Sequence, residues 1–223
     1  MCLFVIYLLY HVMEGSKFMN KKLLGALIGV CAVVILLAVG VVVVFGHLAN
    51  FVDPQRSFYG DSAQYAELLG ENGTYTDKFL GGVDLFPNEL AQSAVVERFA
   101  VEYNKPYNEN YLAYVVYKCN DEDFEAEKAR LQALDSTPEK EYKIYGITEF
   151  PYEPVFVLAD EKVGISYALA IESTKRIVYF SLSFSNYFTD IQYLDNVDTT
   201  YLPKGFDAYP NNARHEQYKK DGK

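Results

Sequence analysis

The stretch "VGISYALAIESTKRIVYFSLSFS", Val163 to Ser185, decides the fold because apolar residues recur in it with a period of two. This is the period of a β-strand, whose successive side chains point to opposite faces of a sheet. In the first half, one face carries Ile165, Tyr167, Leu169 and Ile171. In the second half, one face carries Val178, Phe180, Leu182 and Phe184, opposite a row of serines. Because Ser173 and Thr174 separate the halves, the stretch predicts an antiparallel hairpin.

Further runs predict the strands 94–103, 110–119, 142–147 and 153–159. The run "NYLAYVVYKC", 110–119, is apolar on both faces, as expected of a central strand. The run 94–103 alternates except at Glu97, which falls on the apolar face. Turn residues at 105–108 separate these two runs, so they predict a further hairpin.

The stretch "NDEDFEAEKARLQALD", 120–135, predicts a helix. Its first turn is acidic, which the helix dipole favours, and Phe124, Leu131 and Leu134 share one face. The pairs Glu125/Lys128 and Glu127/Arg130 are interpreted as weak ion pairs on a solvated face, worth about 0.2–0.5 kcal/mol each.

A shorter helix is predicted over 61–71, with Asp61 or Ser62 as its cap. Its apolar contacts are expected from Tyr65, Leu68 and Leu69. The order helix, two strands, helix, four strands predicts an α+β fold, a mainly antiparallel sheet with helices packed on one face. This domain is expected to span 61–202, after a linker at 47–60 and before a polar tail at 203–223 that frays.

The stretch "KKLLGALIGVCAVVILLAVGVVVVFG", Lys21 to Gly46, predicts a transmembrane helix at 23–46. Its 23 residues from Leu23 to Phe45 carry no charge, and as a helix they extend about 35 Å, against ~30 Å of bilayer hydrocarbon. Secretory signals have apolar regions of only ~7–15 residues, so retention as an anchor is favoured over cleavage near Gly46. Cys31 lies in the middle of the segment, which disfavours lipidation.

Residues 1–22 are predicted to be a leader and a cytoplasmic N-terminus, and translation is expected to begin at Met19, which opens "MNKKLL". Lysines precede the helix and few positive charges follow it, so the C-terminal domain is expected outside a cell membrane crossed once. Gly25 and Gly29 form a GxxxG spacing through which two anchors can pair as a homodimer.

The composition of residues 47–223 is acidic, with a net charge of −12. Such a domain is repelled by nucleic acid and anionic headgroups, so neither is expected as a ligand. Cys119 is the domain's only cysteine, which leaves no internal disulfide or cysteine-based zinc site. It is interpreted as a small buried residue at the end of a strand.

The sequence assigns no catalytic residue, no cofactor and no metal ligand. Asp121-Glu122-Asp123 and Asp195/Asn196/Asp198 lack the spacing of a calcium loop, so a helix start and a polar turn are the favoured interpretations. The many acids give no basis for choosing two as a hydrolytic pair. Tyrosine suits protein- and sugar-binding surfaces, and also half-buried strands. The tyrosines considered for a binding face are Tyr111, Tyr114, Tyr117, Tyr142 and Tyr145.

The anchor, the succession of "YLAYVVYK" and "DFEAEKARL", and the later "ISYALAIE" and "RIVYFSLSF" resemble uncharacterised membrane-anchored or lipoprotein-like extracytoplasmic proteins of Gram-positive bacteria. The resemblance implies an envelope location and transfers no functional residue. The leading hypothesis is a non-catalytic binding or accessory module at the cell envelope, with a protein or polysaccharide partner. The alternatives are a carboxylate-dependent hydrolase of a cell-wall polymer, which requires two convergent acids with one raised pKa, and a single-pass envelope sensor.

Overall fold

A computed structural model of the chain describes residues 29, 33–35, 39–41, 55–80, 84–105, 109–137 and 144–221. The chain forms two compact units, Met1–Asp53 and Pro54–Lys223. Most of the predicted anchor, Leu23–Phe45, lies outside the described residues; Gly29, 33–35 and 39–41 are helical. Within the part of the chain that the structure describes, no helix has both the length and the apolar character to cross a membrane.

The second unit is an α+β domain, as predicted, built on a six-stranded antiparallel sheet with few helices. The strands are β1 (Gln55–Tyr59), β2 (Val95–Lys105), β3 (Asn110–Lys118), β4 (Pro154–Asp160), β5 (Gly164–Ile171) and β6 (Arg176–Ser183). The α-helices are α3 (Tyr65–Leu69), α4 (Asp121–Gln132) and α5 (Ala213–Lys220). Short 3-10 helices are η2 (Ser62–Gln64), η3 (Thr76–Lys78), η5 (Glu172–Thr174), η6 (Tyr193–Asp195) and η7 (Thr199–Tyr201).

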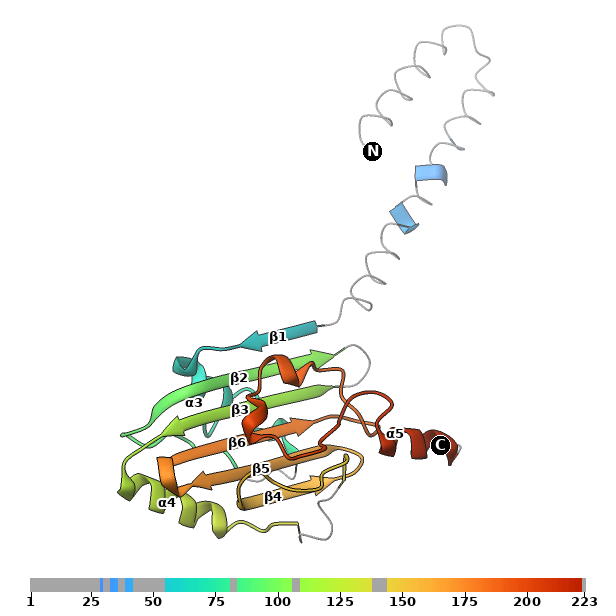
Figure 1. The fold of residues 1–223 in the computed structure, drawn as a ribbon. Coiled ribbons are helices and arrows are strands. Elements are labelled where there is room, and N and C mark those ends of the chain that lie inside the picture. The colour runs from blue at the N-terminus through green and yellow to red at the C-terminus, as the bar shows by residue number, and fades with distance from the viewer. Residues whose placement is uncertain are drawn as a thin grey trace, which may run out of the picture. The chain divides into compact units, whose positions relative to one another are not determined.

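The strand order is β1-β2-β3-β6-β5-β4, and every neighbouring pair is antiparallel (Figure 1). The predicted hairpins β2–β3 and β5–β6 are confirmed, and β3 is central between β2 and β6. Lys175 closes the β5–β6 turn in a left-handed conformation with φ 50°. Both faces of the hairpin are buried, and two serines on its second face satisfy each other: the Ser166 and Ser181 hydroxyls are 2.6 Å apart.

Each face of the sheet carries its own hydrophobic core. On one face, α3 and α4 cover strand residues such as Val115 and Tyr179, with Phe124 of α4 fully buried. On the other face, the segments around Tyr145 and Tyr193 cover Leu182 and Phe180. We call the residues that follow β6, 184–221, the C-terminal segment. Figure 1 shows it, in orange and red, crossing the face of the sheet that is turned to the viewer. The sheet is therefore the middle layer of the domain, although α-helices form only one of its two covers, and the other contains irregular segments and short 3-10 helices.

The predicted helices form where the sequence indicated. The Asn120 side chain caps α4 by accepting from the Asp123 N–H at 2.8 Å, and Phe124 and Leu131 are buried. The shorter helix is η2 followed by α3, capped by Asp61, which accepts from the Ala63 N–H at 2.9 Å. Its buried residues are Tyr65, Leu68 and Leu69, as predicted.

The linker predicted at 47–60 is wrong in its last part, since residues 55–59 form the edge strand β1. The strand follows Pro54 directly, and proline is tolerated at the start of an edge strand. Tyr59 packs against the ring of Tyr75, with ring centroids 6.0 Å apart. Because the strand is short and largely exposed, its alternation does not stand out in the sequence.

The strand prediction at 142–147 is also wrong over its described residues, 144–147, which form a turn. The Ile147 N–H closes this turn by donating to the Ile144 carbonyl. Tyr145 and Gly146 have φ of 55° and 77°, which no β-strand adopts. The Tyr145 hydroxyl instead reaches across to donate to the Asp160 carbonyl at 2.6 Å. The apolar residues of this run are therefore core residues of a turn.

The polar tail predicted at 203–223 packs against the domain over much of its described length. Ala208 is fully buried in the second core, and Phe206 contacts the rings of Phe180 and Tyr193. Asn212 is buried and donates to the Tyr187 and Tyr209 carbonyls while it caps α5. The segment is thus the cover of one sheet face.

Candidate functional site

A β-bulge interrupts β2 at the end of the sheet where β2 and β6 begin. Val96 pairs with Tyr117 and Arg98 pairs with Val116, so Glu97 has no residue opposite it on β3. A bulge inserts an extra residue into one strand and redirects the side chains beside it. This explains why Glu97 falls on the apolar side of a strict alternation in the sequence: the alternation shifts by one residue there.

The Glu97 carboxylate is held by two cations, one from the neighbouring strand β3 and one from β6 beyond it. Arg176 of β6 donates from Nε to Oε2 at 2.6 Å and from Nη2 to Oε1 at 3.2 Å, and Lys118 Nζ of β3 lies 2.8 Å from Oε1. The hydrogen bond from Arg176, with a further one from Lys118, lowers the pKa of Glu97 to about 2. Glu97 is therefore ionised at any physiological pH, and its charge is used within the protein.

A pocket of about 380 Å³ opens beside the bulge, at the small end of the range for ligand sites. The bulge, β3 and β6 supply one part of its lining, and η7 of the C-terminal segment supplies the rest. Its lining residues are Glu97, Arg98, Val116, Arg176, Asp198 and Tyr201. We call it the bulge pocket.

Asp198 caps η7 from inside the bulge pocket. Its carboxylate accepts from the Thr200 N–H at 2.9 Å. Hydrogen bonds from the side chain and backbone of Thr200 lower the pKa of Asp198, and the positive charge of Arg98 lowers it further. Both carboxylates of the pocket are thus held in the ionised form.

Arg98 is the cation of the bulge pocket that forms no ion pair at contact distance, although its charge acts on Asp198 from further away. Its Nη1 donates to the Glu97 carbonyl at 2.9 Å, and none of the ion pairs among the described residues includes it. A guanidinium has five N–H donors in a planar fork that matches a carboxylate. Most of these donors are available to a group that enters the pocket.

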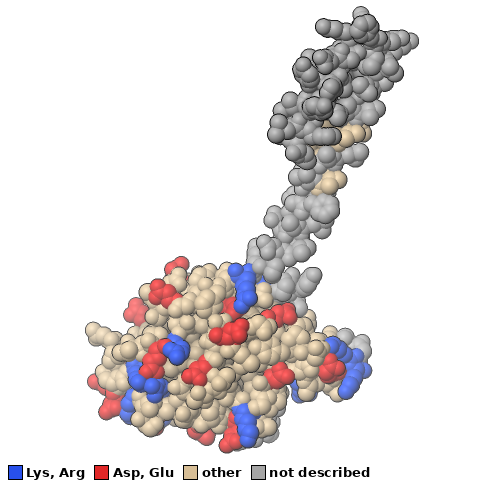
Figure 2. Space-filling view, turned by 45° about the horizontal axis from the view of Figure 1, so that its top comes forward, with Lys and Arg blue, Asp and Glu red and all other residues tan. Residues whose placement is uncertain are grey.

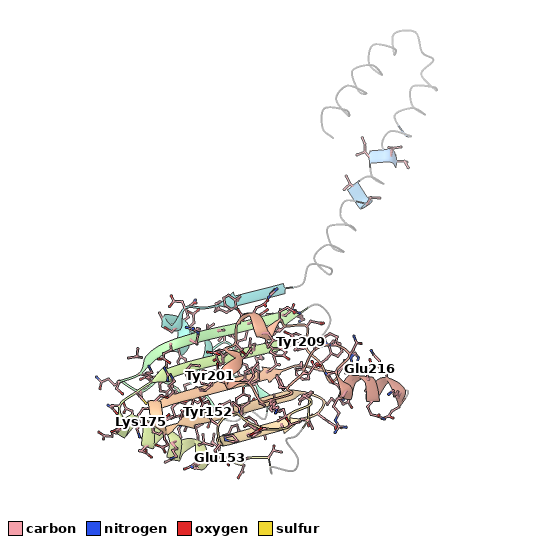
Figure 3. All side chains as sticks on the ribbon, viewed as in Figure 1. Tyr152, Glu153, Lys175, Tyr201, Tyr209 and Glu216 are labelled. Carbon is pink, nitrogen blue, oxygen red and sulfur yellow. The ribbon has the colours of Figure 1, made fainter. Side chains whose placement is uncertain are left out.

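Tyr201 of the bulge pocket and Tyr152, which contacts it from outside the pocket lining, form an aromatic wall. The rings of Tyr152 and Tyr201 are 6.2 Å apart between centroids and tilted by 38°, and Figure 3 shows them close together over the sheet. Tyr152 is 39% exposed. The backbone of Tyr201 is fixed from below, because the buried Tyr167 hydroxyl donates to its carbonyl at 2.9 Å. The wall is therefore anchored to the core and open to solvent.

The tyrosine face considered from the sequence is not formed. Tyr111 and Tyr117 are buried on the face covered by α4, whereas Tyr114 and Tyr145 are buried on the opposite face. Tyr142 lies outside the described residues. The exposed Tyr152 and the half-buried Tyr201 do meet, in segments that gave no regular pattern.

The acidic clusters weighed for calcium have structural partners. Asp123 accepts from the Ser93 hydroxyl at 2.5 Å, and Asp121 lies 3.6 Å from Lys175 Nζ. Asn196 donates from Nδ2 to the buried Glu102 carboxylate at 3.0 Å. Among the residues that the structure describes, no group of three His, Cys, Asp or Glu side chains is placed to hold a metal ion.

The interpretation of Glu127 and Arg130 as a solvated pair is wrong. Glu127 is only 9% exposed and accepts from Tyr179, and Arg130 donates to it from Nε and Nη2. The Arg130 guanidinium also donates to the carbonyls of Asp84 and Leu85. The pair therefore fastens α4 to β6 and to the 84–87 loop, which the sequence spacing of the two residues does not reveal.

Cys119 is half-buried, and burial raises the pKa of its thiol to about 11. The thiol is therefore protonated and unreactive at neutral pH, in keeping with the structural role that the sequence favours.

On the face that Figure 2 views, charged side chains of one sign do not form a continuous surface. Figure 2 shows acidic and basic side chains scattered, often beside one another, across the face that it views, between broad uncharged areas.

A comparison of the chain with protein-family models, curated proteins and solved structures finds no match. The bulge pocket is therefore the feature of the domain that points to a function.

Proposed function

We propose that the chain is a single-pass protein of the cell envelope, held by Leu23–Phe45, whose outer domain is a non-catalytic binding module. Its ligand carries a carboxylate, which enters the bulge pocket and pairs with Arg98. The anchor part of this proposal rests on the length and apolar character of the N-terminal segment. The binding part rests on the pocket.

The observation that carries the proposal is the charge state of the bulge pocket. Glu97 is neutralised by Arg176 and Lys118, and Asp198 accepts from η7, while Arg98 keeps donors without a carboxylate partner. An anionic oxygen pair of a ligand supplies that partner. Charge-assisted bidentate hydrogen bonds to arginine are among the strongest single contacts that a protein makes with a carboxylate.

The aromatic wall adds contact area beside the charge. Tyrosine presents a rigid apolar ring with a polar tip, which suits the faces of sugar rings and of peptide groups. An acidic sugar and a peptide carboxyl terminus share the required chemistry, and both are available outside a bacterial membrane. The carboxylate is therefore the recognised group, and its carrier is decided by experiment.

Hydrolysis by paired acids is less well supported at this pocket. A general acid must hold its proton near neutral pH, which requires a raised pKa. The pKa of Glu97 is lowered to about 2 and that of Asp198 is lowered as well. Neither carboxylate has the environment of a proton donor.

The binding part is tested with the full chain in detergent micelles by isothermal titration calorimetry. The probes are glucuronate against glucose, and N-acetylalanine against its uncharged amide. We expect at least one acid to bind tenfold or more tightly than its neutral counterpart. We also expect Arg98→Gln to lose most of that preference, since a tenfold change corresponds to about 1.4 kcal/mol.

Arg214→Gln is the matched control, because Arg214 is a partly exposed arginine paired with Glu161 outside the bulge pocket. It should bind like the wild type. Equal binding of acid and neutral probes in both pairs, or an acid preference that survives Arg98→Gln, contradicts the proposal.

The location is tested separately, with protease added to whole cells. We expect the domain to be cleaved while the anchor stays with the membrane fraction. Recovery of the mature domain in the medium, trimmed near Gly46, or its full protection from protease, overturns the anchored arrangement.

A further inference from the structure

The strand β1 forms an edge of the sheet to which no described segment adds a further strand. It pairs with β2 on one side only. The opposite edge differs, because Thr137 donates from its N–H to the Val157 carbonyl of β4, and Ser136 and Thr137 accept from the N–H groups of Val157 and Ala159. An uncovered edge offers alternate N–H and C=O groups to a second strand.

The side chains of β1 are unusual for an uncovered edge. Phe58 is 52% exposed, which no other phenylalanine among the described residues approaches. Arg56 lies two residues away, and so on the same face of the strand. An exposed aromatic side chain on an edge strand favours pairing with a second strand, and the charge of Arg56, which could protect the edge, is paired with Glu102.

Arg56 is held in a fixed orientation. Its Nε and Nη2 each lie 2.8 Å from Oε1 of Glu102, a fully buried carboxylate that also accepts from Asn196. These contacts use the edge of the guanidinium, and the side chain stays 53% exposed. A guanidinium can stack its flat face on an aromatic ring while its edge is hydrogen-bonded.

We propose that two copies of this chain pair through β1, antiparallel and with a two-fold axis at Ser57. In this register Arg56 of one copy lies opposite Phe58 of the other, and the reverse pair forms on the far side of the axis. Facing side chains of paired strands have Cβ atoms about 4.5–5.5 Å apart, which lets each guanidinium stack on a phenyl ring. The strand is thus complementary to itself, and a second copy is its occupant.

The register makes a sharp test possible in the full chain. With Cys2, Cys31 and Cys119 replaced by serine, Ser57→Cys places a thiol at the two-fold axis. Facing Cα atoms are then about 4.5–5.5 Å apart, within the range of a disulfide. We expect mild oxidation in detergent micelles to cross-link Ser57→Cys at least fivefold more than Tyr152→Cys, an exposed position away from β1.

Addition of Phe58→Asp should reduce the cross-link at least fivefold. Val95→Asp is its matched control, since Val95 is a 65% exposed apolar residue elsewhere on the sheet, and it should leave the cross-link unchanged. Circular dichroism of each variant verifies the fold.

Three outcomes overturn the proposal. The first is Ser57→Cys cross-linking no more than Tyr152→Cys. The second is a cross-link that survives Phe58→Asp. The third is a cross-link that responds to Gly25→Leu with Gly29→Leu but not to Phe58→Asp, because it assigns pairing to the anchor. Neither Ser57 nor Phe58 lines the bulge pocket. The failure of β1 pairing would therefore leave the proposed carboxylate binding unaffected, and the reverse also holds.

Discussion

At the scale of single residues, Phe180 shows how completely the sheet is enclosed. It is fully buried, stacks on Tyr167 at 4.9 Å between centroids, and meets Phe206 from the C-terminal segment at 5.8 Å. Burial of such a ring contributes roughly 1.5–3 kcal/mol, and a charge in its place has no partner.

We expect Phe180→Asp to unfold the domain or to lower its free energy of unfolding by more than about 4 kcal/mol. Phe180→Leu is the control and should cost less than the acidic variant, because it leaves an apolar side chain. Urea denaturation followed by circular dichroism measures both. An aspartate variant as stable as the wild type would be incompatible with the buried position of this ring.

Glu97 makes the stability of the domain depend on acid pH. Its pKa is lowered in the folded state, so its ion pairs stabilise the fold above the unfolded pKa of about 4.5, and this stability is lost as pH falls toward 2. The carboxylate is 27% exposed, so after solvent screening we expect a contribution of roughly 1 kcal/mol.

Glu97→Gln should therefore be less stable than the wild type at pH 7 and should lose less stability between pH 5 and pH 3. Thermal melting across this range measures the two slopes. Parallel slopes would mean that the Arg176 and Lys118 contacts contribute nothing to folding. The variant also keeps Arg98, so it separates pocket stability from ligand charge.

At the scale of elements, the link between α4 and β6 depends on one phenol. The Tyr179 hydroxyl donates to Glu127, and burial raises the pKa of Tyr179 well above its ordinary value, so it remains a donor. The contact between the Tyr117 and Tyr179 hydroxyls is longer than the contact between Tyr179 and Glu127, with 3.3 Å between the two oxygens. We expect Tyr179→Phe to cost about 1.5–3 kcal/mol and Tyr117→Phe less than about 1 kcal/mol. Chemical denaturation of both variants tests this order, which an equal loss would contradict.

The elements also show what sequence reasoning reaches. The β5–β6 hairpin is predictable because large apolar residues recur at a period of two in both strands, with a short turn between them, although nearly every residue of the two strands is buried. β1 is not predicted because five residues at an edge carry little alternation, and the strand prediction at 142–147 is wrong because apolar residues also fill buried turns. Local pattern therefore identifies elements in which apolar residues recur at the period of a strand or a helix.

The candidate site could not be predicted from the sequence, for a different reason. Arg98 and Tyr201 are far apart in the chain and meet only because η7 crosses the sheet beside the bulge. The irregular position of Glu97 was the one local signal, and it indicated a bulge without indicating what lies beside it. Sites assembled from distant segments leave no spacing to recognise.

At the scale of the whole molecule, the C-terminal segment belongs to the fold. We expect a chain that ends at Leu202 to lose cooperative melting and to aggregate, because removal of Phe206 and Ala208 exposes the second core. A chain that ends at Asn212 lacks α5, which has no buried residue, and should melt within a few degrees of the wild type. Differential scanning calorimetry distinguishes the two truncations. A cooperative transition in the shorter chain would show that the segment is dispensable.

The aromatic wall beside the bulge pocket has one practical consequence. The chain contains 20 tyrosines and no tryptophan, so its natural fluorescence comes from phenols alone. An indole introduced as Tyr152→Trp would therefore be the sole emitter of its kind, placed in the half of the wall that is 39% exposed. The emission wavelength and intensity of this indole would change with the exposure of that surface to water. Binding of a ligand beside it would therefore be measurable by fluorescence without any added label.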